Sequence, residues 1–457
     1  MYAIEFLKER ENMKKEVKLI SILLCLCFMV GLLTNCAPQK AIPSGGGDVE
    51  TKLVVWNLPL GRIGYKDLLK KNPNDAYALA TKKIIDTFEK ENPGVKIELA
   101  DRGWADELRK NILLALVSGQ IPDVFGQEVF ISEFAQKNMI AEIDISDFKD
   151  DMVADVLKIS KYKGKNYGVP IFTGVLGLSY NTKLLKEAGF DPITPPSTWQ
   201  GLLDMSGVVQ KANDNEKVGG VTIYGPDGTA GCIFRFYPFL LQAGGGLLDE
   251  NGKVKVDTSQ NEKAFTYLRN LSKNTIKNQV AMSNWTAILS LIHKNQTAFE
   301  IESNISITFA QESTEKNVSW APLPKIDDTV KVNKNVLIGT LTLCIPEKST
   351  KKVLAQKFIK MMLRDEFQKL FFTVDARLPV IKSVLKNPEL VAQIPQMQVY
   401  IDELLNNELY PPLILESHGN DVNLELEALW KKIIQTNEPI KGLLEKTQKN
   451  IDDILKQ

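Results

Sequence analysis

Apolar and polar positions in the first hundred residues follow the rhythm of strands alternating with helices. The stretch 51–57 is short and rich in β-branched residues, which predicts a buried strand. Apolar residues then recur at helical spacing over 77–88, and the sequence Asn-Pro-Gly at 92–94 predicts the end of that helix. Apolar residues alternate over 95–99, as in a half-buried strand.

The same rhythm continues through the next thirty residues. Apolar residues at 108, 112 and 115 line one helical face that ends at Gly119, and 122–125 reads as the entry to a third strand. Strands that alternate with helices favour a parallel sheet with crossover helices. The sequence therefore predicts an α/β fold for the first third of the chain.

Later patterns predict one long extended segment and several helices. Residues 167–180 are apolar and glycine-rich, which is typical of an extended crossing segment followed by a buried strand. A short helix is expected over 182–188, and Thr198 is expected to cap the next helix. Helical spacing of apolar residues recurs over 354–362, 426–433 and 443–455.

The N-terminal segment has the pattern of a secretory signal. An apolar run over 19–33 follows three lysines and is shorter than a membrane span of about 20 residues. Leu33-Thr34-Asn35-Cys36 resembles a bacterial lipobox, in which the signal is cut before a lipidated cysteine, although Asn35 departs from the usual small residue. A plain signal peptide and an uncleaved anchor are the alternatives, and translation starts at Met1 or Met13. We expect a lipoprotein signal over 1–36 and a flexible linker over 37–50.

Length and charge limit the number of lobes and the kinds of partner expected for the remaining chain. A folded part of about 400 residues is more than one hydrophobic core usually holds, so two lobes are expected. Charged residues make up 25% of the chain and the formal net charge is zero, so the composition indicates no basic face for nucleic acid.

Few residues suit redox, metal or histidine chemistry. Outside the signal and the lipidation candidate, Cys232 and Cys344 are the only cysteines, and either one disulfide or two buried thiols would suit them. His293 and His418 are the only histidines, which leaves little for a histidine-based catalytic or zinc site. We therefore expect no cofactor and no metal site.

Six segments in order resemble the extracellular solute-binding proteins of ABC importers, in particular the group of maltose-binding and other oligosaccharide-binding lipoproteins. These segments span nearly all of the mature chain: 84–98, 113–125, 180–199 with its Tyr-Asn and Pro-Ser-Thr-Trp signature, 239–245, 321–324 and 377–380.

The resemblance implies a hinged, two-lobe periplasmic-binding-protein fold of type II, with ligand held in the cleft. It implies an N-lobe of 51–171 plus 341–380 and a C-lobe of 172–340 plus 381–457. Three interlobe crossings are expected near 170–174, 339–344 and 378–382. A ligand that contacts both lobes would favour the closed form.

Sugar sites pair aromatic rings with Asp, Glu, Asn, Gln and Arg, because sugars offer hydroxyls and weakly apolar ring faces. In the first lobe, a strand end and a loop offer the candidates Trp56, Asn57 and Trp104. The resemblance implies ligand contacts a few positions after Pro122-Asp123, where Gln127 and Glu128 match best. Asp123 is interpreted as a structural acceptor instead.

In the second lobe and the crossing, positions that match the family's ligand contacts are Thr173, Phe234, Arg235, Ser303 and Asn304. Several differ in type from those of the maltose-binding group, which argues against maltose itself. Glu416, which precedes a predicted helix start, is a further candidate for the cleft, and a solvated loop is the alternative there. Trp199, Trp285, Trp320 and Trp430 lie in helical or strand patterns and are interpreted as packing residues.

The predicted function is a substrate-binding lipoprotein, not an enzyme, that delivers a carbohydrate to the transmembrane subunits of an ABC permease. It would be a monomer anchored at Cys36 on the extracytoplasmic face of a bacterial membrane. Alternatives are another small solute, such as a polyamine, glycerol phosphate or metal chelate, service to a sensor kinase, or an extracellular glycosidase.

Overall fold

The structure is a computed structural model that describes residues 50–456 apart from 104, 129, 214–216, 227–230, 277–278, 280–283, 313–315 and 412–417. The residues from 50 on form one compact unit. The signal segment, nearly all of the linker and Cys36 therefore lie outside the described residues. Among the helices that are described, none is long and apolar enough to cross a membrane.

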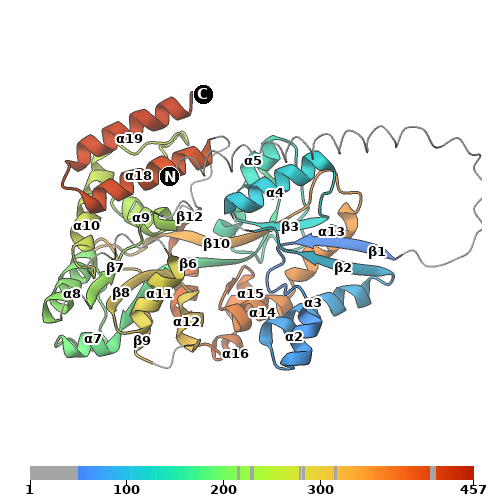
Figure 1. Cartoon of the computed structure of the whole chain (residues 1–457), viewed down its shortest axis with the longest axis horizontal. Coiled ribbons are helices and arrows are strands. Elements are labelled where there is room, and N and C mark those ends of the chain that lie inside the picture. Colours follow the sequence, from blue (N-terminus) through green and yellow to red (C-terminus); the bar gives the residue numbers. More distant parts are fainter. Residues whose placement is uncertain are drawn as a thin grey trace, which may run out of the picture. The chain divides into compact units, whose positions relative to one another are not determined.

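A ten-stranded mixed sheet runs through the described unit, with the strand order β2-β1-β3-β10-β6-β8-β7 along its main path (Figure 1). The strand β1 is parallel to β2 and β3, and β7 is parallel to β8. The central strands β10 and β6 are antiparallel to each other, and β9, β11 and β12 pair with one or the other. The predicted α/β class and the parallel start of the sheet are confirmed.

The first part of the unit carries the predicted alternation of strands and helices. Its elements are β1 Thr51–Trp56, α2 Tyr65–Lys71, α3 Ala76–Glu91, β2 Val95–Ala100, α4 Ala105–Ser118, β3 Val124–Gln127, α5 Ile131–Gln136, α6 Ala154–Leu157, η1 Lys158–Ser160, β4 Lys161–Tyr162 and β5 Lys165–Asn166.

The middle part contains the long strands and most helices of the second half. Its elements are β6 Val169–Asn181, α7 Thr182–Glu187, α8 Trp199–Ala212, β7 Gly219–Thr222, α9 Gly231–Gln242, α10 Ser259–Ser272, α11 Trp285–His293, β8 Thr297–Ser303, α12 Ser306–Glu312, β9 Val318–Ala321 and β10 Lys334–Cys344.

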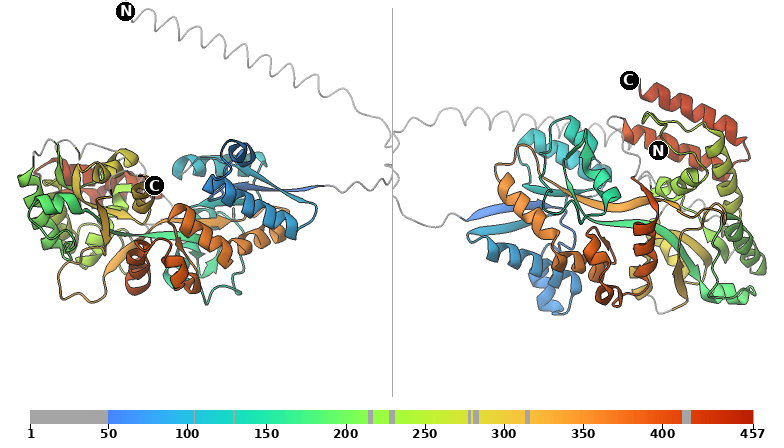
Figure 2. Two further views of the ribbon diagram at one scale, coloured as in Figure 1. Left: turned by 90° about the horizontal axis from the view of Figure 1, so that it is seen from below. Right: turned by 180° about the vertical axis from the view of Figure 1, so that it is seen from behind.

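The last part is mainly helical. Its elements are α13 Lys352–Met362, α14 Asp365–Asp375, β11 Leu378–Pro379, α15 Lys382–Leu385, α16 Pro388–Val391, α17 Met397–Asn406, β12 Glu408–Tyr410, α18 Gly419–Gln435 and α19 Ile440–Ile454. The C-terminal helices α18 and α19 lie beside α10, at the opposite end of the sheet from α3 (Figure 2).

Local physical chemistry explains the helix α3. Asp75 caps it by accepting a hydrogen bond from the amide of Ala78 at 2.8 Å. Its apolar face is buried, and Phe88 packs edge-on against Phe358 with ring centroids 5.1 Å apart. Burial of one such phenylalanine side chain contributes roughly 1.5–3 kcal/mol.

Two large hydrophobic cores lie along the sheet. One includes Leu53, Phe88 and Phe358, and the other includes Trp199, Phe239 and Trp430. The strand β6 is buried along its whole length; its residues up to Val175 pack in the first core, and residues from Leu176 on pack in the second. This burial explains the unbroken apolar pattern of the segment.

The helices of the last part of the chain divide between the two cores, but this division does not test the predicted lobe boundaries. Apolar residues of α15 to α17 belong to the first core, whereas those of α18 and α19 belong to the second. The division into two lobes, the hinge and the three crossings stay predictions.

Both described cysteines, Cys232 and Cys344, are buried free thiols. Of the two alternatives, the structure therefore has the pair of buried thiols and not the disulfide. Burial raises the pKa of the Cys344 thiol to about 12. The thiol therefore behaves as a packing group rather than as a nucleophile.

Candidate functional site

The candidate site lies where β6 and β10 pass from one core to the other. The hydroxyls of Thr173 and Thr340 are 2.6 Å apart and link the two strands. Gly174 allows the backbones to approach closely, because a Cβ there would lie 2.7 Å from Asn304 Oδ1 and 2.9 Å from the carbonyl oxygen of Ile338. The predicted residue Thr173 is thus part of the strand junction.

Asn304 joins three segments at this junction. Its side chain is 1% exposed, its Nδ2 donates to the carbonyl of Ala376 at 2.5 Å, and its Oδ1 accepts from the amide of Val175 at 3.3 Å. These bonds hold the end of β8 against the turn after α14. Asn304 therefore fixes the position of the residue that follows Ala376, which is Arg377.

Arg377 places a guanidinium at the junction from the side of the first core. Its Nε donates to Asp375 Oδ2 at 3.0 Å, and its guanidinium carbon lies 5.1 Å from the ring centroid of Phe172. Gly339 has the left-handed φ of 58°, and a Cβ there would lie 3.1 Å from Arg377 Nη1. A glycine at this position thus leaves space for the arginine.

Glu128 is the candidate whose carboxyl pKa is affected by the charge of Arg377. Its side chain is exposed to solvent. The surrounding protein nevertheless desolvates its carboxyl and raises its pKa, while the positive charge of Arg377 lowers it.

Tyr77 extends this polar group toward α3. Its hydroxyl donates to Asp375 Oδ1 at 2.7 Å, so Asp375 bridges Tyr77 and Arg377. The guanidinium of Arg62 lies 4.1 Å from the Tyr77 ring centroid. Burial and the charge of Asp375 raise the pKa of the Tyr77 hydroxyl, which therefore remains a hydrogen-bond donor.

The candidates at the ends of β1 and β3 are buried. Asn57 is 4% exposed; its Nδ2 donates to the carbonyl of Gly103 at 2.5 Å and its Oδ1 accepts from the amide of Arg102 at 3.0 Å. The guanidinium of Arg102 lies 4.9 Å from the ring centroid of Trp56, which is 6% exposed. Both residues therefore support the loop that leads to residue 104.

Gln127 is fully buried at the end of β3. Its Oε1 accepts from the amide of Phe130 at 2.6 Å, and its Nε2 lies 3.8 Å from Cys344 Sγ. Asp123, on the same segment, accepts from the amide of Val54 at 2.9 Å, from Ser349 Oγ at 3.0 Å and from Lys351 Nζ at 2.9 Å. The interpretation of Asp123 as a structural acceptor is confirmed.

A buried ion pair lies on the side of the second core, where Glu302 of β8 precedes Asn304 by two residues. Arg235 Nη2 donates to Glu302 Oε2 at 2.5 Å, and the two side chains are 11% and 1% exposed. Tyr224 donates its hydroxyl to the same carboxylate at 2.7 Å, and the Arg235 guanidinium lies 3.8 Å from the Tyr224 ring centroid. Burial alone would raise the pKa of Glu302, but Arg235 and the hydrogen bonds hold it below its usual value.

A second buried carboxyl, Glu300, lies two residues earlier on β8. Burial and the neighbouring charge of Glu302 raise its pKa well above the usual value, which favours the protonated form of the carboxyl. Its Oε1 lies 3.3 Å from the Tyr224 hydroxyl oxygen, whose proton is donated to Glu302 over the shorter distance.

Trp285 and Phe309 add aromatic surface on this side. Trp285 Nε1 donates to Glu302 Oε2 at 3.1 Å, and its ring meets that of Phe309 edge-on with centroids 5.6 Å apart. Trp199 and Trp430 are buried as expected of packing residues and Trp320 is half-buried, whereas Trp285 packs against Phe309 but is 37% exposed. The candidate Phe234 is half-buried on α9.

The structure brings part of the predicted set to one junction. Thr173, Ser303, Asn304 and Arg235 gather there, with Ser303 donating to Glu302 at 3.0 Å. Trp104 and Glu416 lie outside the described residues. The ligand-binding roles of all the candidates stay predictions.

Sequence reasoning missed several residues of the junction, namely Tyr77, Tyr224, Trp285, Glu302, Asp375 and Arg377. Two signals pointed to some of them. Glu300 and Glu302 alternate with apolar residues in a segment that is otherwise a buried strand, and Arg377 opens the last of the six family-like segments. Charged residues inside a buried strand require a partner, and that requirement is a usable signal.

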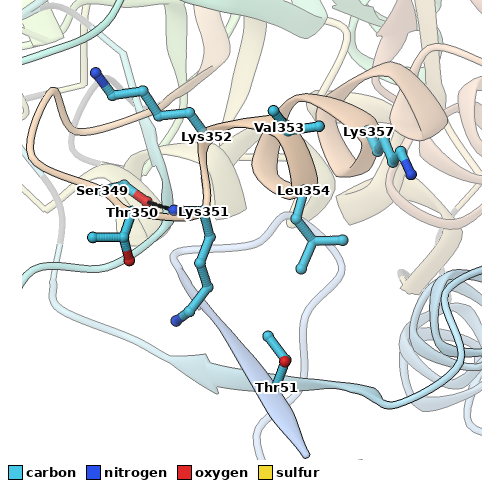
Figure 3. Close-up of a pocket in the computed structure, with 8 residues that line it drawn as sticks. All are labelled: Thr51, Ser349, Thr350, Lys351, Lys352, Val353, Leu354 and Lys357. Carbon is cyan, nitrogen blue, oxygen red and sulfur yellow. Dashed lines mark hydrogen bonds between the residues drawn. The ribbon is translucent and has the colours of Figure 1, made fainter.

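Two surface hollows occur elsewhere in the described residues. One, of about 540 Å³, is lined by Thr51 and by residues 349–354 and 357; Figure 3 shows that Lys351 and Lys352 point in different directions. The other, of about 650 Å³, is lined by residues 142–146, 149, 166 and 356. Both contain none of the candidates, and Lys351 and Lys352 already pair with Asp123 and Glu347.

The described part of the chain contains no group of three or more His, Cys, Asp or Glu side chains arranged to hold a metal ion.

Comparison of the sequence with known families gives one match. The sequence profile described as "Bacterial extracellular solute-binding protein" matches residues 83–399, which is more than half of the chain. Three similar curated proteins have related names. "Putative ABC transporter periplasmic-binding protein YcjN" of Escherichia coli is 26% identical over 70% of this chain and 77% of its own.

The other two relatives bind sugars according to their names. An arabinooligosaccharide-binding protein of Bacillus subtilis is 23% identical over 57% of this chain and 55% of its own. A multiple sugar-binding protein of Streptococcus mutans is 25% identical over 66% of this chain and 72% of its own.

Solved structures share the fold. A cyclic α-maltosyl-1,6-maltose-binding protein of Arthrobacter globiformis superposes with a TM-score of 0.72 at 19% identity, covering 89% of this chain and 99% of that one. UgpB of Mycobacterium tuberculosis, in complex with glycerophosphocholine, gives 0.71 at 19% identity, covering 90% and 99%. The chain therefore has the α/β fold of these binding proteins.

Proposed function

We propose, from the premise that the chain belongs to the bacterial extracellular solute-binding protein family, that it captures a carbohydrate for an ABC importer. Members of this family bind solutes, so the chain is a binding protein and not an enzyme. Two of the relatives above carry sugar-binding names, and the third carries the name of an ABC-transporter component. These names support the carbohydrate and the importer as proposals for this chain.

One observation carries the proposal: polar and aromatic groups attached to the two cores are linked through the hydrogen bonds that Asn304 makes at the junction of β6 and β10. Glu128 and Arg377 come from the side of the first core, and Arg235 and Trp285 come from the side of the second. A sugar needs such a combination, because its hydroxyls take charged hydrogen-bond partners and its ring faces pack on aromatic side chains.

The same arrangement supports capture by closure of two lobes about the junction. A ligand that contacts both sides gains interactions that an open form does not offer, and this difference in affinity shifts the population toward the closed form. The predicted crossings near 170–174, 339–344 and 378–382 would act as the hinge. The ligand is then an oligosaccharide or smaller sugar held between the lobes.

Glycerol phosphate esters are a second candidate, because a fold relative binds glycerophosphocholine and because Arg62 and Arg377 lie on one side of the junction. The charge of Arg377 is, however, shared between Asp375 at 3.0 Å and the nearby Glu128. A phosphate group would have to compete with two carboxylates. The balance of charge favours a neutral saccharide.

The N-terminal sequence supports placement at the outer face of the cell membrane. We propose that Cys36 carries the lipid anchor and that the linker lets the binding unit reach the permease subunits. Two or more acyl chains hold a protein almost permanently, at about 0.8 kcal/mol per buried CH₂.

Thermal-shift screening tests the proposal. The full chain, purified in a detergent without a sugar headgroup, is heated with maltotriose, arabinotriose, raffinose, lactose and glycerophosphocholine in separate samples. A sugar that binds only the folded form at 100 times its Kd adds about 2.7 kcal/mol of stability. We expect one or more sugars to raise the melting temperature and glycerophosphocholine to leave it unchanged.

Two variants locate the response. Glu128→Ala should abolish the sugar-dependent shift without changing the melting temperature of the sugar-free protein, because Glu128 is exposed. Lys137→Ala, at a surface salt bridge remote from the junction, serves as the matched control and should respond like the parent. A shift with glycerophosphocholine alone would favour the second candidate, and no shift with any compound would contradict both.

A further inference from the structure

Trp285 is the most exposed of the tryptophans whose side chains the structure describes, and Trp320 is half-buried. Trp285 is 37% exposed, whereas Trp56, Trp199 and Trp430 are 6%, 4% and 2% exposed. A partly exposed indole normally gains little by being held in one orientation, because fixing a side chain costs conformational entropy. The contacts of Trp285 nevertheless hold it.

The indole is fixed at two points. Its Nε1 donates to Glu302 Oε2 at 3.1 Å, and its ring lies edge-on to Phe309 with an interplanar angle of 86°. The backbone beneath it is also set, since Asn284 caps α11 by accepting from the amide of Ala287 at 2.8 Å. The exposed part of the ring is therefore presented to solvent in a defined orientation.

Glu302 has no capacity left to bind a ligand itself. Its Oε2 accepts from Tyr224 at 2.7 Å, from Arg235 at 2.5 Å and from Trp285 at 3.1 Å. Its Oε1 accepts from the amide and the hydroxyl of Ser303 at 2.7 Å and 3.0 Å. A carboxylate offers about four lone-pair sites, and five donors already occupy them.

The chain connects Trp285 to the polar groups of the first-core side. Glu302 is two residues before Asn304, whose amide donates to the carbonyl of Ala376. Arg377 follows directly and interacts with Glu128. The indole and the Arg377 guanidinium are thus attached to opposite ends of one short chain of hydrogen-bonded residues.

We infer that Trp285 is an aromatic platform for the apolar face of a saccharide ring, and that Glu302 is a positioning residue that orients this platform without contacting the sugar. The inference rests on the proposed function and names a residue of its site. An orientation that exists before binding removes much of the entropy loss that binding would otherwise impose on the indole.

Fluorine NMR of the full chain with 5-fluorotryptophan tests the inference, in a detergent without a sugar headgroup. The Trp285 signal is assigned by its loss in Trp285→Phe. Maltotriose, arabinotriose, raffinose and lactose are then added separately, and the same samples are heated to record melting temperatures. We expect the sugar that raises the melting temperature most to shift the Trp285 signal.

Variants separate the platform from its support. Trp285→Ala should weaken the affinity for that sugar by about tenfold or more, as expected for an anchoring tryptophan. Glu302→Gln should move the Trp285 signal before any sugar is added, because it replaces the acceptor of the indole, and should weaken binding by a smaller factor. Trp199→Phe, a buried tryptophan whose Nε1 donates to Gln242 at 2.6 Å, is the control and should leave the affinity unchanged.

The possible outcomes distinguish failure of this inference from failure of the proposed function. A sugar that raises the melting temperature but leaves the Trp285 signal unmoved overturns this inference and leaves the proposed function standing. A Trp285 signal that is the same in Glu302→Gln and in the parent overturns the positioning role of Glu302. If no sugar changes either readout, the proposed function fails and the inference fails with it.

Discussion

The two sides of the junction use the same chemistry at different depths. On the second-core side, Arg235 and Glu302 are 11% and 1% exposed, and on the first-core side Arg377 and Asp375 are 24% and 21% exposed. A buried charge without its partner is costly, whereas a pair that water reaches contributes little to stability. The comparison teaches that the deep pair maintains the shape of the site and that the shallow pair remains available to a ligand.

The deep pair should give the largest effect. Glu302→Ala leaves Arg235 buried without its counter-charge, and we expect the free energy of unfolding to fall by about 3–5 kcal/mol. Asp375→Ala, the matched change on the shallow side, removes the ion pair with Arg377 and the acceptor of the Tyr77 hydroxyl, and should lower it by about 1–2 kcal/mol. Urea unfolding of both variants measures the difference, and equal losses would remove the distinction between the two sides.

Glu403 extends the comparison to a buried carboxyl whose hydrogen bond comes from a neutral amide. It is 3% exposed, accepts from Asn335 Nδ2 at 2.7 Å, and burial raises its pKa to about 7. The folded state therefore holds this proton more tightly than the unfolded state, so its contribution to stability is present below pH 4.5 and is lost as the pH rises to 7.

We expect this loss to reach about 3 kcal/mol, because each pKa unit corresponds to about 1.4 kcal/mol. Glu403→Gln cannot ionise at this position. Between pH 4.5 and pH 8 the free energy of unfolding of the variant should therefore rise relative to that of the parent. Chemical unfolding at several pH values measures the two curves. Curves that run parallel would mean that the Glu403 carboxyl titrates normally in the folded protein.

The shallow pair should affect binding rather than folding. Arg377→Ala is expected to weaken the affinity for the sugar that gives the largest thermal shift by about tenfold, which is about 1.4 kcal/mol. Its free energy of unfolding should change by about 1 kcal/mol or less, because water reaches the ion pair. Titration calorimetry gives the first quantity and urea unfolding the second; unchanged affinity would place the ligand away from Arg377.

Tyr77→Phe should have the smallest effect. It removes one hydrogen bond, from the Tyr77 hydroxyl to Asp375, in a half-buried environment. We expect the free energy of unfolding to fall by about 0.5–1.5 kcal/mol. Urea unfolding measures the loss, and a loss as large as that of Glu302→Ala would show that the first-core side is as tightly constrained as the second.

The sequence predicted the elements more completely than it predicted the site. The alternation of strands and helices before residue 125 and the cap at Thr198, which accepts from the amide of Gly201 at 3.1 Å, follow from local patterns and are confirmed. The buried strand expected within 167–180 is confirmed as β6. Local periodicity reports which face of an element is buried, and that information suffices for these elements.

The site depends on contacts that local patterns do not encode. Asn57 and Gln127 end strands, as ligand-binding residues often do, yet their side chains are bonded within the protein. Trp285 has the sequence context of a packing residue. The orientation of its indole is held by a hydrogen bond to Glu302, which lies on another element. Arg377 reaches the junction because Asn304 holds the preceding carbonyl. Each of these placements is set by a partner distant in sequence.

A crystal structure of the chain with the sugar that most raises its melting temperature is the most direct test of the central claim, which is that one saccharide contacts both sides of the junction. The account predicts a single sugar whose ring lies against Trp285 and whose hydroxyls meet Arg377 or Glu128. A sugar bound to one side alone, or bound away from the junction, would contradict it.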